Sequence, residues 1–192
     1  MIFVVLIQVT CSFFFYAAAA ARGKIELLFY AERVNFLEKT NAIRMLEQKK
    51  LPHEVRYYES DGALSGAEVA AQLGLPPEEM FKTLVTVGKS GGHYVFMIPV
   101  EAELDLKKAA KAAGEKSVEM LKSKNLLPLT GYVHGGCSPL GMKKVFPTFV
   151  DASAEGQERM IFSGGRIGVQ IETTAEVLGK AIRVRFLGLV KE

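Results

Sequence analysis

One lysine and two glycine-rich segments are the residues of this sequence whose types and spacing could do chemistry. Lys82 opens an apolar run, where a fixed cation could hold a phosphate or a carbonyl oxygen. Residues 135–141 read Gly-Gly-Cys-Ser-Pro-Leu-Gly, and their backbone N–H groups could bind an anion because glycine lacks a Cβ that would keep a ligand away. Residues 163–165, Ser-Gly-Gly, offer a weaker version of the same feature. The alternative interpretation is structural: Lys82 is a surface lysine at the start of a strand, and the two glycine-rich segments are ordinary turns.

Other catalytic and metal-binding patterns are missing from the sequence. It has no GxxxxGK[ST] phosphate loop, no GxSxG elbow, no HExxH pair and no GxGxxG fingerprint after a predicted strand. The two cysteines, Cys11 and Cys137, form no CxxC pair, and the three histidines are scattered. Cys137 has no histidine or aspartate at a spacing that indicates a catalytic dyad, which favours an inert thiol. We therefore expect no metal and no cofactor.

Length and composition are those of one globular domain. The chain has 192 residues, of which 49% are hydrophobic and 23% charged, so it can bury a core of its own. It carries 24 Lys and Arg against 21 Asp and Glu, a formal net charge of +3. This modest excess permits a nucleic-acid partner without requiring one, since dedicated duplex binders carry a stronger basic stripe.

The first residues differ in composition from the rest of the chain. Residues 1–21 contain no charged side chain and approach the ~20 residues that a bilayer-spanning helix needs. Three interpretations stay open: a signal peptide, although no Lys or Arg precedes the apolar run; a membrane anchor followed by Arg22 and Lys24; or translation from a start codon set too far upstream. We predict that residues 1–33 form a dispensable apolar extension and that residues 34–192 form the functional domain.

From residue 34 onward the pattern alternates helices with strands. Thr40 can cap a first helix, Ser65 and Glu68 form a capping-box pattern before a second, and Asp105 begins an Ala-rich third. Further helices are predicted over 117–124 and, from a second capping-box pattern at Thr173, up to Gly179, and glycine and proline crowd an irregular loop over 128–142. Strands are predicted over 55–58, 82–87, 93–98, 145–150, 160–163, 168–171 and 182–189. Several connections fit hairpins, which predicts a mixed rather than a purely parallel sheet.

Four segments resemble the YbaK/EbsC family, the free-standing relatives of the editing domain of prolyl-tRNA synthetases. The segments are 39–46 (KTNAIRML), 81–85 (FKTLV), 135–144 (GGCSPLGMKK) and 162–165 (FSGG). Each motif is short, and the resemblance is specific because all four occur in the family's order from Lys39 to the C-terminus. Chains of this family begin a few residues before the first segment, which favours the upstream start codon as the origin of residues 1–33.

The resemblance implies a fold, an activity and partners. The fold is a single α/β domain in which a mixed, barrel-like curled sheet is surrounded by helices. The activity is trans-editing: hydrolysis of a wrongly attached amino acid from tRNA, most often cysteine from tRNA(Pro) and also from tRNA(Cys). Mischarged tRNA is then the substrate, prolyl-tRNA synthetase a candidate partner, and the cytoplasm the expected location.

Residue by residue, the resemblance assigns Lys82 and Gly135 to catalysis. The residues expected to bind substrate are Tyr58, Thr83, Gly136, Ser138, Pro139, Ser163, Gly164 and Gly165. Two positions depart from the family pattern. Gln170 stands where some members carry an acidic residue, and residues 62–65 lack an aromatic side chain that some members carry.

The resemblance also implies that the substrate's own cysteine thiol attacks the ester carbonyl, so that the protein supplies no nucleophile. A site of glycines and one lysine agrees with this, because aimed backbone amides stabilise an oxyanion without a metal. Two alternatives stay open: a tRNA- or synthetase-binding module without turnover, and a deacylase for another small amino acid such as alanine that uses an activated water. If residues 1–21 are an anchor, the domain is tethered to a membrane.

Overall fold

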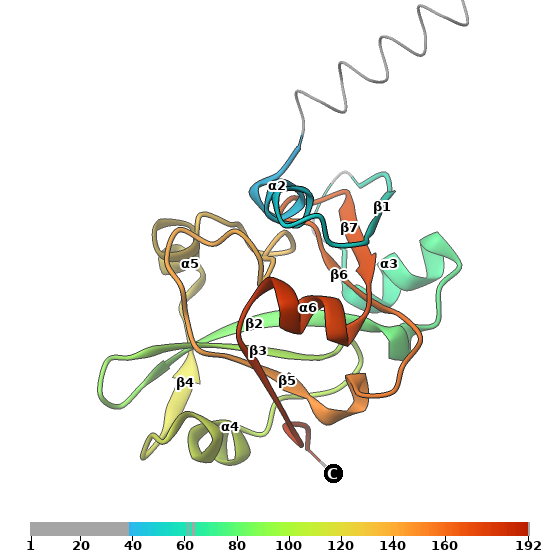
Figure 1. Cartoon of the computed structure of the whole chain (residues 1–192). Helices are drawn as coiled ribbons and strands as arrows, with labels where there is room; N and C mark the ends of the chain where they lie inside the picture. Colours follow the sequence, from blue (N-terminus) through green and yellow to red (C-terminus); the bar gives the residue numbers. More distant parts are fainter. Residues whose placement is uncertain (1–38, 61, 63, 192) are drawn as a thin grey trace, which may run out of the picture. The chain divides into compact units, whose positions relative to one another are not determined.

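The computed structural model describes residues 39–60, 62 and 64–191, and from Thr40 onward these residues form one compact unit (Figure 1). The extension predicted over residues 1–33 lies outside the described residues. The helical elements are α2 (Asn41–Gln48), α3 (Gly66–Leu73), η1 (Pro77–Glu79), α4 (Leu106–Ala113), α5 (Ser123–Thr130), η2 (Ala152–Ala154) and α6 (Ala175–Ala181). The strands are β1 (Glu54–Tyr57), β2 (Met80–Gly88), β3 (His93–Pro99), β4 (Val118–Met120), β5 (Thr148–Asp151), β6 (Met160–Ser163), β7 (Val169–Thr173) and β8 (Val184–Leu187).

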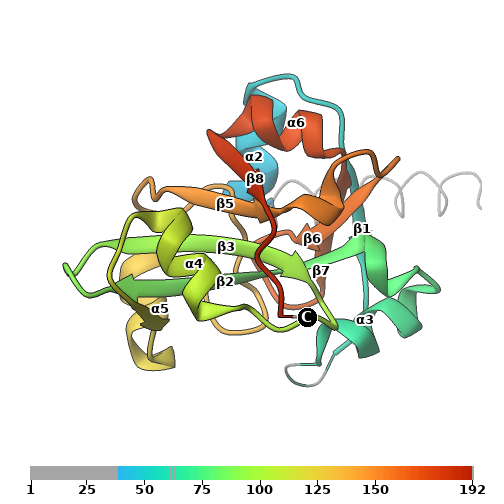
Figure 2. The same ribbon diagram turned by 90° about the horizontal axis from the view of Figure 1, so that it is seen from below.

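The described strands join one mixed sheet. Its order is β1-β7-β6-β2-β3-β5-β8, and β4 pairs with β2 off this path. The β2–β6, β3–β5 and β5–β8 pairs are parallel, and the others are antiparallel. No pairing joins β1 to β8 within the described residues, so the curled sheet stays open. Helices lie around it in both views (Figures 1 and 2). The predicted mixed, curled sheet surrounded by helices is confirmed.

Three helix starts follow the predicted caps. The Thr40 hydroxyl accepts a hydrogen bond from the Ile43 N–H at 3.3 Å and begins α2. Ser65 and Glu68 form the predicted capping box of α3, and Asp105 accepts hydrogen bonds from two backbone N–H groups of α4. These starts were predictable because a cap depends on residues only two or three positions apart.

Two helix predictions were wrong in position. Residues 117–124 do not form a helix: Val118–Met120 pair with β2, and the helix begins at Ser123 and continues through Pro128. The last helix is capped by Thr174, whose hydroxyl accepts from the Val177 N–H at 3.2 Å. Thr173, the predicted cap, instead donates its hydroxyl to a backbone carbonyl before β1.

The β2–β3 hairpin has one helix on each side. Residues of α4 pack with Phe96 and Ile98 of β3, and residues of α5 pack with Val85 of β2 and Val95 of β3. Both views show α4 and α5 on opposite sides of this hairpin (Figures 1 and 2). Because successive side chains of a strand point to opposite faces, the core has one layer on each face of this hairpin.

Candidate functional site

One edge of β2 lacks a strand partner along residues 82–84. On this edge β6 pairs with residues 80–81 and β4 pairs with residues 86–88. The Val85 carbonyl accepts a hydrogen bond from the Leu121 N–H at 2.9 Å. Partners on this edge therefore cover residues 80–81 and 85–88, and residues 82–84 have no strand partner there within the part of the chain that the structure describes. We call residues 82–84 the pairing gap.

The backbone of Thr83 faces the pairing gap. The Val100 N–H donates to the Met80 carbonyl at 2.9 Å and the Gly88 N–H donates to the Gly92 carbonyl at 2.7 Å, so the even-numbered residues of β2 bond to β3. In an antiparallel pair the intervening residues point their N–H and C=O groups the other way. The N–H of Thr83 therefore points into the gap. Its hydroxyl is buried and has no hydrogen-bond partner among the described residues.

Lys82 extends from the pairing gap toward the end of β3. Its Nζ donates to the Val100 carbonyl at 2.8 Å, and its side chain is half-buried. Burial lowers the pKa of this ammonium, and the carboxylate of Glu103 acts in the opposite direction. An ammonium has three N–H groups, and one has a partner among the described residues, so two can reach a ligand. Lys82 is a positioned cation rather than a freely solvated one.

Ser163 lies beside Lys82. Strand β6 runs parallel to β2 with Phe162 next to Phe81, so the following residues of the two strands are neighbours on one face. Tyr58 joins this face from the end of β1, where it packs with the cluster around Met80. The sheet therefore brings together three of the predicted residues, Lys82, Ser163 and Tyr58.

The turn that follows β6 uses its own backbone donors. The Gly164 N–H donates to the Val169 carbonyl at 2.9 Å, and the Gly165 N–H donates to Ser163 Oγ at 3.3 Å. The carbonyl of Gly164 accepts a hydrogen bond from the Thr40 hydroxyl at the start of α2. In this structure Gly164 and Gly165 thus shape the border of the site and keep no backbone N–H for a ligand.

The glycine loop packs against this turn. A Cβ on Gly136 would lie 3.0 Å from the Ile167 nitrogen and 3.1 Å from the Arg166 backbone, and one on Gly165 would lie 2.8 Å from the Tyr132 ring. Gly136 also donates its N–H to the Val133 carbonyl at 3.1 Å. Glycine is needed here because two backbone segments approach more closely than a side chain allows.

Gly135 is the loop glycine that faces outward. It is exposed and has a φ of 79°, whereas Gly136, Ser138 and Pro139 are buried. The Ser138 hydroxyl accepts from the Leu140 N–H at 3.3 Å, an arrangement that shapes the loop. Among the described residues, the N–H of Gly135 has no hydrogen-bond partner. Gly135 therefore presents a backbone N–H that no described residue engages.

Two buried side chains stabilise the loop from within. The Tyr132 hydroxyl donates to the Leu140 carbonyl at 2.7 Å, and burial raises the pKa of this hydroxyl to about 12. The only sequence signal for Tyr132 was its position before the glycine run. Burial also raises the pKa of the Cys137 thiol to about 12, so it is protonated at neutral pH. This agrees with the expectation of an inert thiol.

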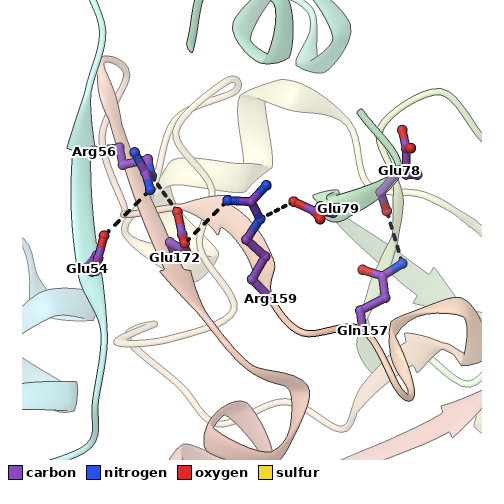
Figure 3. Close-up of polar contacts among 7 residues, drawn as sticks. All are labelled: Glu54, Arg56, Glu78, Glu79, Gln157, Arg159 and Glu172. Carbon is purple, nitrogen blue, oxygen red and sulfur yellow. Dashed lines mark hydrogen bonds and ion pairs between the residues drawn. The ribbon is translucent and has the colours of Figure 1, made fainter. Parts of the chain in front are cut away.

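A chain of ion pairs crosses the same side of the sheet (Figure 3). Glu172 of β7 pairs with Arg56 of β1 and lies 4.0 Å from Arg159, which precedes β6. Arg159 pairs with Glu79 of η1, and Arg56 lies 3.5 Å from Glu54. Each of the three carboxylates in this cluster of ion pairs has a cationic partner. The cluster is therefore suited to holding strands together rather than to proton transfer. Sequence reasoning missed it, because its members are distant in the chain.

Glu172→Gln should lower the free energy of unfolding by about 1–3 kcal/mol, because two arginines lose their shared carboxylate. The Glu172 side chain is 15% exposed, so solvent screens its ion pairs weakly. Urea unfolding measures the change. The matched control is Glu176→Gln, which breaks the pair of a 76% exposed side chain with Lys180 and should change the stability far less, because solvent screens this pair. Equal losses in the two variants would contradict the structural role of the cluster.

Gln170 occupies the position next to Ser163 on the neighbouring strand. The register pairs it with Ser163 on one side and with Arg56 on the other, and its side chain is buried. The structure places no carboxylate at this position. The acidic residue two positions later, Glu172, is engaged in the ion pairs described above.

The described residues contain neither a metal-binding cluster nor a membrane-spanning helix. Residues 39–60, 62 and 64–191 contain no group of three or more His, Cys, Asp or Glu side chains that could hold a metal ion. Over the same part of the chain, no helix has the length and apolar character needed to cross a bilayer.

The sequence matches the family described as "Aminoacyl-tRNA editing domain" over residues 61–180. A protein of Enterococcus faecalis is 50% identical to the chain over 142 residues, which cover 73% of this chain and 87% of that protein. The name of that protein is "Putative Cys-tRNA(Pro)/Cys-tRNA(Cys) deacylase EbsC".

Two crystal structures share the fold. One, of "a putative trans-editing enzyme for prolyl tRNA synthetase", superposes with a TM-score of 0.70 and covers 79% of this chain and 96% of that one. The other, of a hypothetical protein, has a TM-score of 0.73 and covers 79% and 100%. Both are 23% identical to the chain, so the likeness concerns the fold alone.

Proposed function

The chain belongs to the aminoacyl-tRNA editing domain family, and from this premise we propose that it is a trans-editing deacylase of mischarged aminoacyl-tRNA. Its main substrate in this proposal is Cys-tRNA(Pro), with Cys-tRNA(Cys) as a second. The observation that carries the proposal is the 50% identity over 142 residues with the Enterococcus faecalis protein that is named for this activity. We place the reaction in the cytoplasm, where charged tRNA is used.

In this proposal, backbone N–H groups at the pairing gap and the glycine loop point at the carbonyl oxygen of the ester. Negative charge develops on the carbonyl oxygen during attack, and the N–H groups of Thr83 and Gly135 can stabilise it. Loss of one such donor typically costs roughly 10²–10³ in rate. The two N–H groups of Lys82 that have no partner among the described residues suit a phosphate of the terminal nucleotide or the ester itself. Tyr58 and Ser163, on the face of Lys82, are the proposed contacts for the rest of the esterified end.

The nucleophile in this proposal comes from the substrate. The thiolate of the esterified cysteine attacks its own carbonyl carbon, the bond from that carbon to the ribose oxygen breaks, and the ribose oxygen takes up a proton. Water then opens the thiolactone to free cysteine. The four-membered ring is strained, but intramolecular attack in a fixed geometry can reach effective molarities of ~10⁵–10⁸ M. Cys137 does not replace this thiol, because it is buried and protonated.

Prolyl-tRNA synthetase is the partner that we propose for delivery of the tRNA. The chain has a formal net charge of only +3, which does not require tight binding to free tRNA. A synthetase that passes on its mischarged product would raise the effective concentration of substrate without adding contacts to the site.

The purified protein should deacylate Cys-tRNA(Pro) at least ~10-fold faster than alanyl- or seryl-tRNA(Pro), because only cysteine carries a thiol that can attack intramolecularly. The rate should rise with pH toward the pKa of a free thiol, about 8.5, as the thiolate fraction grows. Release of the amino acid from each tRNA over pH 6–9 measures both effects.

The Cys137→Ser variant is the control and should keep the wild-type rate and pH profile. Comparable rates on alanyl-tRNA would indicate an activated water and would overturn the substrate-assisted step. A protein that binds these tRNAs but releases no amino acid from any of them would be a binding module without turnover.

A further inference from the structure

The segment that carries the glycine loop has a strongly biased charge. Residues 120–150 contain no Asp or Glu, but they contain Lys122, Lys124, Lys143 and Lys144. Since this segment contributes +4 to a formal net charge of +3, the remainder of the chain is net negative. The formal net charge of the chain is therefore small although residues 120–150 form a basic region.

The fold directs these lysines outward. The apolar residues of the segment pack inward on the cluster of Val85 and Val95, and they are Leu121, Leu126, Leu129, Tyr132, Cys137, Met142 and Phe146. All four lysines are exposed, and none makes an ion pair or a side-chain hydrogen bond with the residues that the structure describes. Charges that have no internal partner are available to an external one.

Three of the lysines lie at the two ends of α5, and Lys144 follows Lys143 in the chain. Lys122 is the residue that precedes the first turn, and Lys124 belongs to that turn. The stem of Lys143 lies over Gly131, the residue that ends the helix: a Cβ there would be 3.2 Å from the Lys143 Cγ. A helix of eight residues is about 12 Å long, so the positive charges are spread over roughly that distance. We call these four residues the lysine surface.

The lysine surface is continuous with the proposed site. Gly135 lies between the two lysine pairs in the chain, and the loop that contains it packs against the turn after β6. Leu126 and Leu129 of α5 pack with Val85, the residue of β2 that follows the pairing gap. An extended anionic ligand with its end at the pairing gap would therefore pass over or beside α5.

We propose that Lys122, Lys124, Lys143 and Lys144 bind backbone phosphates of the tRNA acceptor stem while the aminoacylated end occupies the pairing gap. The inference rests on the proposed function for the identity of the nucleic acid. Lysine ammoniums act as point charges toward phosphates, so these contacts fix position and carry little sequence preference. The surface thus provides affinity for any acceptor stem, and the choice among tRNAs lies with the amino acid or with the synthetase.

The chemistry of the surface favours RNA over a protein partner. Leu127, Val133 and Val145 are exposed by 50%, 45% and 98% on the same segment, and apolar side chains of this kind also occur where proteins dock. They are single residues separated along the chain, however, whereas the absence of carboxylates extends over the whole segment. Uniform positive charge matches a phosphate backbone.

The test compares the wild type with the variant K122Q/K124Q/K143Q/K144Q. Binding of uncharged tRNA(Pro) is titrated at salt concentrations from 50 to 200 mM. Each lysine that binds a phosphate contributes about −0.7 to −0.9 to the slope of log K against log salt, so replacing all four should make the slope shallower by about 3. The ratio of the wild-type affinity to the variant affinity should accordingly fall by roughly 60-fold between 50 and 200 mM salt. For Cys-tRNA(Pro), KM should rise while kcat changes by less than ~2-fold.

The matched control replaces four exposed lysines outside the segment, as K89Q/K107Q/K111Q/K116Q, with the same change in net charge. This variant should keep a salt slope close to that of the wild type. Equal salt slopes and equal KM values for the wild type and the lysine-surface variant would overturn the proposal. So would a variant that binds tRNA normally but no longer binds prolyl-tRNA synthetase, since the surface would then dock a protein.

A cysteinyl ester of the trinucleotide CCA separates this proposal from the proposed function. It has no acceptor stem, so the lysine-surface variant should hydrolyse it at the wild-type rate. A wild type that hydrolyses neither this ester nor Cys-tRNA(Pro) contradicts the deacylase function, while the salt slopes still decide whether the lysines bind phosphates. Slower hydrolysis of the trinucleotide ester by the variant would place the lysines in the reaction itself and contradict a role limited to the stem.

Discussion

Lys82→Met should lower kcat/KM for Cys-tRNA(Pro) by roughly 10²–10³, the effect expected when one charged donor to the reacting end is lost. Methionine keeps the unbranched stem but has no N–H group for the Val100 carbonyl or for the ligand. The fold should survive the change. The variant loses one hydrogen bond but also removes a half-buried charge, and these terms oppose each other, so the free energy of unfolding should change by less than ~1.5 kcal/mol.

Lys49→Met is the matched control for this prediction. The Lys49 Nζ donates to the Ala181 carbonyl at 2.8 Å, the same kind of bond at the same length, but at the far end of α2. Single-turnover deacylation and urea unfolding of both variants separate chemistry from stability. Comparable activity in the two variants would mean that Lys82 is only a structural lysine at the start of a strand.

Gly135→Ala should lower the deacylation rate by about 10²-fold, as expected for loss of one backbone donor to the oxyanion. Gly135 has a φ of 79°, where any residue with a Cβ is strained by about 1–2 kcal/mol, and its N–H has no partner among the described residues. In the proposed site the added methyl group would stand on the path of the ester, and relief of the strain would turn the N–H away. Both effects reduce stabilisation of the reacting carbonyl.

Strain alone is controlled by Gly156→Ala. Gly156 also has a φ of 79°, it is exposed, and a Cβ there would meet nothing within 4 Å. The two variants should therefore lose similar stability, and only the Gly135 variant should lose activity. If both deacylate at the wild-type rate, the glycine loop does not supply the donor, and the backbone of Thr83 would have to act without it.

Local sequence patterns predicted most elements of the fold. Thr40, Ser65 and Asp105 begin helices because their side chains satisfy N–H groups two or three residues away, and Gly74 and Gly114 end helices in the left-handed conformation. These signals act within one turn of the chain, so they can be recognised without knowledge of the tertiary structure. The four family segments likewise indicated the mixed sheet, and they supplied the residues of the proposed site.

Predictions failed where a distant partner decided the structure. Residues 118–120 form β4 because β2 offers Thr86–Gly88 as a pairing edge, and that edge is far away in the chain. The helix after it includes Pro128, which was expected in a loop, because residues of α5 pack on Val85 and Val95. Tertiary packing outweighed the local preference of proline.

The sequence by itself therefore predicted which segments surround the proposed site: the Lys82 strand, the glycine loop and the Ser163 turn. Tertiary structure alone decided which atoms of those segments face a ligand. Strand register turns the Thr83 N–H into the pairing gap, and close packing engages the N–H groups of Gly136, Gly164 and Gly165 in bonds within the protein. The reason is physical. Residue type and spacing determine which hydrogen-bond donors a segment has, but residues far away in the chain determine which of these donors are bonded within the protein and which stay open to a ligand.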